Sequence, residues 1–177
     1  MIGIRLFQPA EFEEFRTIRR EALVSAPDAF SVKVADFDQR PIAPEKARFI
    51  SNTSDPNRMI AGAWVDGQIS GMIGLFQQSE PGFKHRAMAW GVFSSPNARG
   101  LGLGKQMLQL LAKETSKIDG VNQIVLSVLA SNTQAIHFYK KIGMEQFTPA
   151  GNDPLVDHAT TDDEAFMVLH LNSDLSK

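Results

Sequence analysis

Seven consecutive residues with three glycines, residues 99–105 (Arg-Gly-Leu-Gly-Leu-Gly-Lys), are the part of this sequence best suited to bind a ligand. They stand between a predicted strand and a predicted long helix. Backbone N–H groups at a helix N-terminus have no acceptor inside the helix and carry the positive end of its dipole, so they bind anions. Glycine lets that backbone approach a phosphate without side chains in the way. The segment predicts a phosphate-binding loop; the alternative interpretation is a tight strand-to-helix turn.

Two common phosphate-loop patterns do not match these residues. The Walker pattern requires a glycine where Arg99 stands, and a serine or threonine where Gln106 stands. The dinucleotide-binding fingerprint requires a third glycine at Lys105 or at Met107, depending on which glycine begins the count. A nucleotide-binding domain of either kind is therefore not expected.

A third phosphate-loop pattern matches the loop, and the similarity continues in the residues before and after it. Arg99-x-x-Gly102-x-Gly104 resembles the pyrophosphate-binding motif of the GNAT acetyltransferases, (Gln/Arg)-x-x-Gly-x-(Gly/Ala). Residues 92–96 (Val-Phe-Ser-Ser-Pro) are similar to the fourth strand and proline of that family. Residues 131–144, with an asparagine, a Phe-Tyr pair and a closing glycine-apolar pair, are similar to its second hallmark. The resemblance covers most of the chain in element order, and residues 89–144 in specific positions.

The resemblance implies a way of binding acetyl-CoA as cosubstrate. Backbone N–H groups of the loop would hold the pyrophosphate, and Arg99 would support the loop, although a solvated surface arginine is the plain alternative. Pantetheine amides would pair with backbone in a slot where the fourth and fifth strands splay apart, and Phe138 would pack beside the cofactor. The cofactor-binding residues implied are Val92, Phe93, Ser94, Arg99, Gly100, Leu101, Gly102, Leu103, Gly104, Lys105, Asn132, Phe138 and Tyr139.

Three of these residues are expected to act in catalysis. The N–H of Ser94 would face the thioester carbonyl, where one donor to the oxyanion can contribute roughly 3 kcal/mol. Tyr139, the single tyrosine, would protonate the departing thiolate, since a phenol titrates near 10 and a thiol near 8.5; a core tyrosine is its alternative. The resemblance implies that Asn132 bonds pantetheine or the amine; a helix cap is its alternative, although Ser131 is the better cap candidate.

The sequence departs from the family pattern on the fourth strand, which often carries a glutamate as general base. Residues 86–93 contain no carboxylate, although an alkyl ammonium near 10.4 must lose its proton before it attacks. Glu80, His85, Asp163, Glu164 or a water chain could receive the proton, and we name no base. The residues that line the acceptor pocket are also left unassigned, because each candidate could be an ordinary core residue. These candidates are Phe30, Phe37, Phe76 and Trp90.

Alternating and helical apolar patterns predict the elements that position these residues. Strands are expected at 2–6, 59–65, 68–77, 86–93, 123–129, 145–148 and 165–171, with a two-residue turn at Asp66-Gly67. Helices are expected from Pro9 to Pro27, at 45–50, at 102–118 and from a capping box at 131–134 to Gly143. The fold class is therefore α/β. We expect a mixed, mostly antiparallel sheet of about seven strands with flanking helices, splayed between strands 4 and 5, in a single domain over 1–177.

Composition excludes several function classes. The chain has 177 residues, a net charge of −2 and no cysteine, so nucleic-acid binding, disulfides and a covalent acetyl-cysteine are not expected. The four histidines are scattered, so no metal site is expected. No segment has the length of a membrane span or the pattern of a secretory signal, which favours a cytoplasmic protein without a membrane partner.

The expected activity is N-acetyltransfer from acetyl-CoA to a primary amine, by direct attack in a ternary complex. The amine could belong to a small molecule, a peptide or a protein. A non-catalytic CoA-binding regulatory module is the alternative, which the missing carboxylate motivates. Similar proteins often form homodimers, and this chain has no exposed apolar stripe that proves one.

Overall fold

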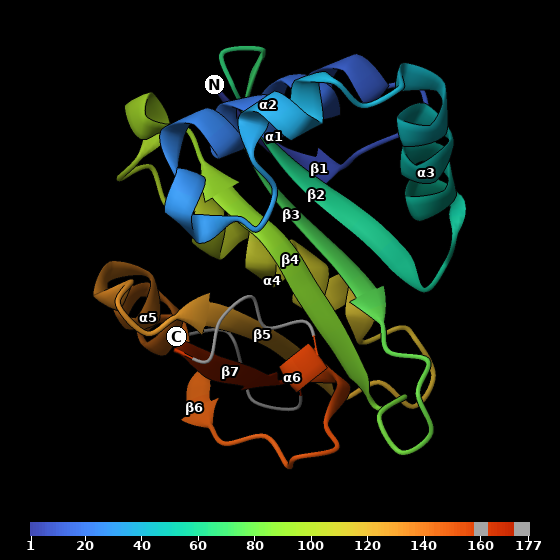
Figure 1. Cartoon of the computed structure of the whole chain (residues 1–177), viewed down its shortest axis with the longest axis vertical. Helices are drawn as coiled ribbons and strands as arrows, with labels where there is room; N and C mark the ends of the chain where they lie inside the picture. Colours follow the sequence, from blue (N-terminus) through green and yellow to red (C-terminus); the bar gives the residue numbers. More distant parts are fainter. Residues whose placement is uncertain (158–162, 172–177) are drawn as a thin grey trace. The chain divides into compact units, whose positions relative to one another are not determined.

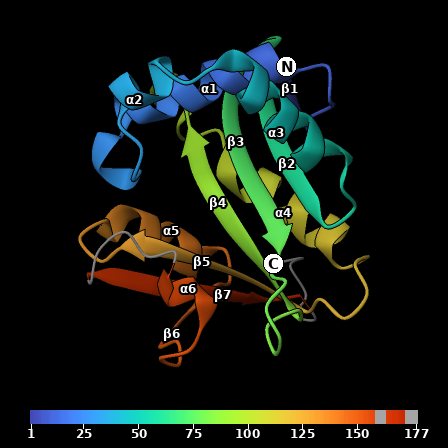
Figure 2. The ribbon, with the colours of Figure 1, turned by 45° about the vertical axis from the view of Figure 1, so that its right-hand side comes forward.

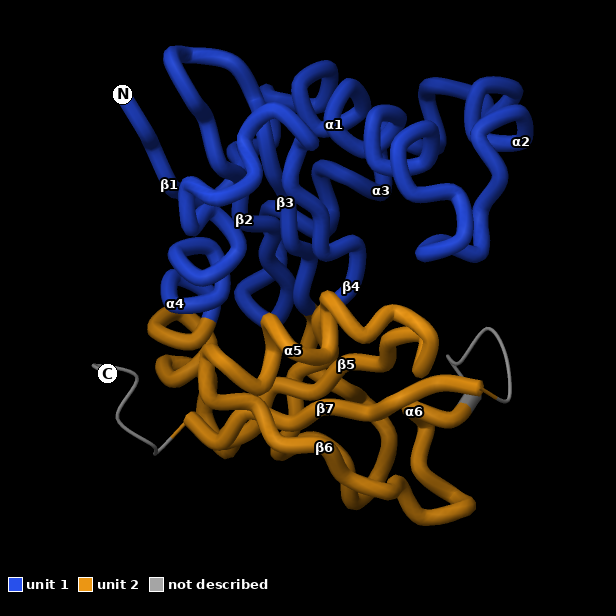
Figure 3. Tube along the Cα trace, turned by 90° about the vertical axis from the view of Figure 1, so that its left-hand side faces the viewer, with its two compact units in different colours: residues 1–75, 90–111 blue, residues 76–89, 112–177 orange. Residues whose placement is uncertain are grey.

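The structure is a computed structural model, and it describes residues 1–157 and 163–171. Seven strands form one open mixed sheet in the order β1-β2-β3-β4-β5-β7-β6, with helices beside it (Figure 1). The predicted mixed α/β sheet with flanking helices is thereby confirmed. Contacts along the chain define two compact units, residues 1–75 with 90–111 and residues 76–89 with 112–177 (Figure 3). In the described residues, no helix has the length and apolar character needed to cross a bilayer.

Unit 1 carries the N-terminal strands and helices. Its elements are β1 (Ile2–Leu6), α1 (Phe12–Ser25), the 3-10 turn η1 (Pro27–Ala29), α2 (Val34–Asp38), α3 (Ile42–Ser54), β2 (Arg58–Val65), most of β3 (Gln68–Gln77), the second half of β4 (Arg86–Ser94), the 3-10 turn η2 (Pro96–Ala98) and most of α4 (Leu103–Thr115). β1 pairs antiparallel with β2, from Ile2 opposite Val65 to Leu6 opposite Ala61.

An aromatic cluster forms the core of unit 1. Apolar residues of α1 recur on one stripe, which is the period that buries one face of a helix. Phe15 of α1 stacks on Phe49 of α3 with ring centroids 4.8 Å apart, and Phe7 lies 5.0 Å from Trp64. Met72 of β3 is fully buried in the same cluster. This cluster fixes α1 against the sheet.

The two faces of β3 in unit 1 are covered by different helices. A Cβ added to Gly71 would lie 3.0 Å from the methyl carbon of Met107 on α4, whereas the next residue, Met72, packs in the cluster with α1. Successive residues of a strand point to opposite faces. α1 and α4 therefore cover opposite faces, as Figures 1 and 2 show.

The segment after α1 is more helical than the sequence predicts. The expected short helix at 45–50 is part of α3, which has 13 residues and begins at Ile42. Pro44 does not break α3 because it lies in the first turn, where backbone N–H groups have no acceptor inside the helix. Phe37 of α2 is buried, with 2% of its surface exposed, so it belongs to the core.

Unit 2 is built around a buried central strand. Its elements are the first half of β4, the end of α4, β5 (Gln123–Leu129), α5 (Thr133–Lys141), β6 (Glu145–Phe147), α6 (Pro154–Asp157) and β7 (Glu164–His170). β5 pairs antiparallel with β7, from Gln123 opposite His170 to Leu129 opposite Glu164. β5 also pairs parallel with β4, where Arg86, Ala87 and Met88 lie opposite Gln123, Ile124 and Val125.

Several boundaries in unit 2 differ from the expected ones. α4 ends at Thr115, although the sequence predicts a helix to 118, because the chain tightens there into a turn in which Ile118 N–H donates to Thr115 O. The short α6 was not predicted. Phe76 packs against a cluster of Met88, Val125, Leu155 and Val168, so it belongs to the core of this unit.

Candidate functional site

The glycine-rich loop leads from β4 into α4 through two left-handed residues. Gly100 has φ of +82° and Gly102 has φ of +72°. Residues with side chains rarely adopt this conformation, so glycine is required at both positions. Leu101 between them is 43% exposed, whereas Leu103 is buried and anchors the start of α4. The first helical hydrogen bond of this region runs from Gln106 N–H to Gly102 O, at 3.1 Å.

The space beside this loop suits a diphosphate. A Cβ added to Gly100 would meet no atom within 4 Å, and one added to Gly102 would meet only the side-chain nitrogen of Gln106, at 3.8 Å. N–H groups in the first turn of a helix have no acceptor within it, and α4 is 13 residues long. The loop thus combines exposed backbone, open space and a helix dipole, which are the features of an anion site.

Three polar side chains surround the loop. Arg99 and Lys105 are exposed and bring two positive charges to it. The side-chain amide of Gln106 points back to the loop, with its nitrogen 3.4 Å from Leu101 O and 3.5 Å from Gly102 O. Sequence analysis missed this role of Gln106, and its position four residues after Gly102 is the signal that could have indicated it.

β4 carries a backbone irregularity before its predicted cofactor-binding residues. Gly91 has φ of +63° inside the strand, a conformation that marks a bulge at which a strand changes direction. Phe93 is then buried in the aromatic cluster, while Val92 and Ser94 are half-buried. Their peptide groups are thereby held by a strand whose side chains are anchored in the core.

A hydrogen bond attaches the end of β4 to α1. Ser95 Oγ donates to Glu21 Oε2 at 2.9 Å, and Ser95 N–H donates to Ser70 O of β3 at 2.8 Å. Both partners lie in unit 1, and Ser95 is buried. Ser94, which precedes it, is therefore positioned by contacts to a strand and to a helix.

In unit 2, Asn132 is the N-cap of α5. Its Oδ1 accepts a hydrogen bond from Ala135 N–H at 3.1 Å. The expectation that Ser131 caps this helix is wrong, because the chain turns at Ser131, where Thr133 N–H donates to Ser131 O, and the helix begins one residue later than predicted. Asparagine is as good a cap as serine, so the turn geometry decides between them.

Tyr139 and Phe138 lie on the last turns of α5, with ring centroids 5.4 Å apart. Tyr139 is buried, with 6% of its surface exposed, and Phe138 is half-buried. No residue in 1–157 or 163–171 forms a hydrogen bond with the Tyr139 hydroxyl. Burial raises the pKa of the Tyr139 phenol above its ordinary value of 10.0, because the phenolate would lose its hydration. The phenol is therefore held neutral, as a proton donor must be.

Three of the four candidate general bases, His85, Asp163 and Glu164, lie near the ends of β5 in unit 2, and Glu80 lies in the loop between β3 and β4. His85 O accepts from Asn122 N–H at 2.9 Å, beside the start of β5. Asp163 O accepts from Ala130 N–H at 3.0 Å, just past the end of β5 and before the turn that holds Asn132. Glu164 lies opposite Leu129 in the same ladder. Asp163 and Glu164 therefore lie at the end of β5 that leads to Asn132, whereas His85 lies at the other end.

The predicted site residues thus form two groups. In unit 1, the loop from Arg99 to Lys105 follows Val92, Phe93 and Ser94 within one strand-turn-helix segment. In unit 2, Asn132, Phe138 and Tyr139 share α5 and its cap. The nine residues of β4 include no carboxylate, as the sequence shows.

Comparisons with known proteins bear on the family and the fold. The sequence profile of the acetyltransferase (GNAT) family matches residues 15–144, and no curated protein sequence matches the chain. Three solved structures have the same fold. An acetyltransferase of the GNAT family from Streptococcus pneumoniae has a TM-score of 0.76 and 15% identity, over 96% of this chain and 99% of that one. The structure of yncA from Salmonella typhimurium with acetyl-CoA has a TM-score of 0.70 and 19% identity, over 98% of this chain and 96% of that one. The PaiA N-acetyltransferase from Thermoplasma acidophilum with coenzyme A has a TM-score of 0.70 and 20% identity, over 96% of this chain and 99% of that one.

Proposed function

This chain belongs to the acetyltransferase (GNAT) family, and from that premise we propose that it transfers the acetyl group of acetyl-CoA to a primary amine. Acetyl-CoA is the acyl donor of the family. The observation that carries the proposal is the loop before α4, whose left-handed Gly100 and Gly102 lie inside the matched residues with open space beside them. The family assignment covers acetyl transfer, and the proposal adds that the acceptor is an amine.

The loop residues would hold the diphosphate of the donor. Backbone N–H groups from Leu101 to Lys105 are the donors, and glycine at 100 and 102 keeps side chains out of their way. Arg99 and Lys105 would add charge at an exposed position, where each contributes a modest amount of affinity. The backbone of Val92, Phe93 and Ser94 at the end of β4 would pair with pantetheine amides.

Three groups of the chain would act on the reacting atoms. When bound, the donor supplies a thioester carbonyl that an amine can attack. Ser94 N–H would bond the oxygen of that carbonyl, where negative charge develops, and the hydrogen bonds of Ser95 would keep this peptide in place. Tyr139 would give its proton to the sulfur that leaves, and Asn132 would use its side-chain N–H groups to position pantetheine or the amine.

Transfer would be direct because the chain has no cysteine to carry the acetyl group. The acceptor amine must arrive unprotonated or lose its proton to another group. With no carboxylate on β4, Asp163, Glu164 or water would receive that proton. Because burial raises the pKa of Tyr139, its phenol is protonated at neutral pH and cannot be the base that receives this proton.

The test is release of CoA from acetyl-CoA over a panel of primary amines, followed with a thiol reagent. The absence of cysteine means that the protein adds no background to this assay. We expect amine-dependent release, with the acetylated amine found by mass spectrometry in equal amount. Tight binding of acetyl-CoA with no release on any amine would instead favour the CoA-binding regulatory module. A cytoplasmic location and a homodimer stay predictions, for cell fractionation and light scattering to check.

A further inference from the structure

Arg19 of α1 has a buried guanidinium nitrogen without a hydrogen-bond partner in unit 1. Its Nη1 has no accessible surface and no bond to any atom of the described residues. An arginine has five N–H donors, and a buried donor that bonds nothing destabilises the protein unless something binds it. Arg19 therefore differs from Arg5, Arg16 and Arg20, each of which is paired with a carboxylate.

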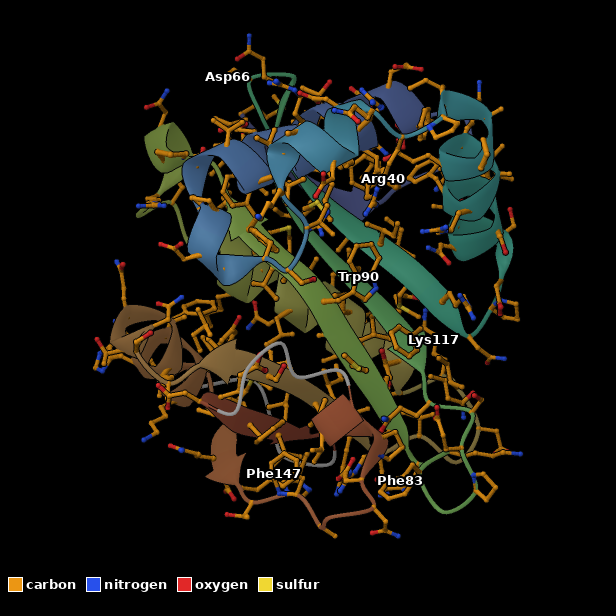
Figure 4. The ribbon with its side chains drawn as sticks, viewed as in Figure 1. Arg40, Asp66, Phe83, Trp90, Lys117 and Phe147 are labelled. Atoms are coloured by element: carbon orange, nitrogen blue, oxygen red, sulfur yellow. The ribbon has the colours of Figure 1, made fainter. Side chains whose placement is uncertain are left out.

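The guanidinium of Arg19 lies near two aromatic rings. Its central carbon is 4.8 Å from the ring centre of Phe30 and 6.0 Å from that of Trp90. Trp90 lies on β4 (Figure 4). Both rings are also in contact with the aromatic core of the unit. Rings attract the cation through their faces but accept few of its N–H groups, so these contacts leave the Nη1 donor of Arg19 without an acceptor.

The backbone of β4 makes room for this side chain. A Cβ added to Gly91 would lie 3.5 Å from Arg19 Nη1 and 3.0 Å from the methyl carbon of Met72. The left-handed bulge at Gly91 thus sits directly beside the unpaired nitrogen. Ser94 follows three residues later on the same strand, about 10 Å along it.

The charges near Arg19 leave a positive excess. Arg40, beyond the end of α2, repels Arg19, and Glu45 is the carboxylate that attracts it. Glu45 is already bonded to Arg16, with 3.2 Å between Arg16 Nε and Glu45 Oε2. Burial, with Arg40 adding to its effect, lowers the pKa of Arg19 to about 10. A bound anion would accept the unpaired N–H of Arg19, neutralise its buried charge and offset its repulsion by Arg40.

We infer that Arg19 binds the carboxylate of the acceptor, so that the acceptor is an amine that also carries a carboxylate and an apolar body. A carboxylate is planar and takes two N–H groups of a guanidinium at once. Phe30 and Trp90 would enclose the apolar part of such a molecule. This inference rests on the proposed function, because it names the class of amine that the same strand receives.

The experiment compares matched amines that differ only in the carboxylate. One pair is L-phenylalanine and phenethylamine, and the other is 5-aminopentanoate and pentylamine, because the spacing from Gly91 to Ser94 favours a longer molecule. We expect kcat/KM to be about 10- to 100-fold higher for the carboxylate member of at least one pair. Equal values within both pairs would overturn the inference and leave acetyl transfer to amines intact.

Arg19→Met and Arg20→Met form a matched set of variants. Both remove one charge from α1, but Arg20 is exposed and paired with Asp38. Arg19→Met should abolish the preference for the carboxylate member of each pair. Arg20→Met should keep the preference, and Arg19→Lys should keep part of it. A preference that survives in Arg19→Met would overturn the inference.

A binding measurement separates this inference from the proposed function. Calorimetry with N-acetyl-L-phenylalanine or 5-acetamidopentanoate should detect binding to the wild-type protein and at least about 10-fold weaker binding to Arg19→Met. N-pentylacetamide, which lacks the carboxylate, should not distinguish the two proteins. If the acids bind more tightly to the wild type than to Arg19→Met but no amine releases CoA, the proposed acetyl transfer fails and the carboxylate site stands. If neither acid binds more tightly to the wild type, the carboxylate site fails.

Discussion

Asn132 Oδ1 accepts the N–H of Ala135 at 3.1 Å, and this bond begins α5, the helix that carries Tyr139. One side chain therefore starts the helix and is also the asparagine that we propose to position pantetheine or the amine. The oxygen of the amide is used in the cap. The side-chain nitrogen is the part available for pantetheine or an amine.

Substitution of Asn132 should separate these two tasks. Asn132→Ala removes the cap, so the free energy of unfolding should fall by about 1 kcal/mol. Asn132→Ser keeps a capping oxygen but has no amide nitrogen, so its stability should stay close to wild type while kcat/KM falls about 10-fold. Denaturant unfolding and steady-state kinetics on the same preparations give both values. Full activity in Asn132→Ser would show that Asn132 is only a cap.

Gly102→Ala should weaken acetyl-CoA binding by more than its effect on stability explains. Alanine at a φ of +72° costs about 1 kcal/mol of backbone strain, and its methyl group would stand at the loop surface that faces the diphosphate. We expect Kd for acetyl-CoA, from calorimetry, to rise about 10-fold or more.

Gly120→Ala is the control for this change. Gly120 has φ of +77° and, like Gly100, open space around an added Cβ, but it belongs to the turn after the end of α4 and not to residues 99–105. The strain should lower the melting temperature by a similar amount, with Kd for acetyl-CoA unchanged. If both variants weaken binding equally, the effect of Gly102 is one of folding and not of the loop.

Tyr139→Phe should lower turnover by roughly 10²- to 10⁴-fold, with little change in the affinity for CoA. The substitution removes one hydroxyl from a buried ring that packs beside Phe138, so the fold should be kept. Single-turnover kinetics and calorimetry with CoA are the measurements. Unchanged turnover would leave Tyr139 as a core tyrosine.

The alkaline behaviour of Tyr139 follows from its raised pKa. Below pH 10 the phenol is neutral in the folded and unfolded chains alike, and its contribution to stability is complete. Above pH 10 the unfolded chain loses the proton first, so this contribution is lost as the pH approaches the folded pKa. Because Tyr139 is the single tyrosine, absorbance at 295 nm reports it alone. Tyrosinate should appear near pH 10 in denaturant and at higher pH in the native protein; equal midpoints would contradict the burial of this group.

The pH dependence of acetyl transfer should follow the acceptor amine. β4 carries no carboxylate to take its proton, so kcat/KM should rise with the fraction of unprotonated amine. Profiles for two acceptors with different amine pKa values should show inflections that differ by the same amount. Inflections at one pH for both acceptors would indicate a base on the protein, and Glu164→Gln and Asp163→Asn would then identify it.

Much of the candidate site could be predicted from the sequence because its parts are local. The conformation of Gly100 and Gly102 and the start of α4 beside them depend on residues that are neighbours in the chain. The strands from β2 to β5 were predicted to within one residue for the same reason, since each buried face repeats within a single element. The segment from 28 to 57 was harder to predict because its prolines can end a helix or begin one, and Pro44 lies inside α3.

The sequence by itself determined the family motif, the order of the elements and the absence of any cysteine. Only the tertiary structure decided that Asn132 and not Ser131 caps α5, that Tyr139 is buried, and that Arg19 lies unpaired beside Trp90 and Gly91. Burial and pairing depend on groups far apart along the chain, so no local pattern contains them. A charged residue on a helix looks the same in sequence whether its partner is a carboxylate, as for Arg20, or is missing, as for Arg19.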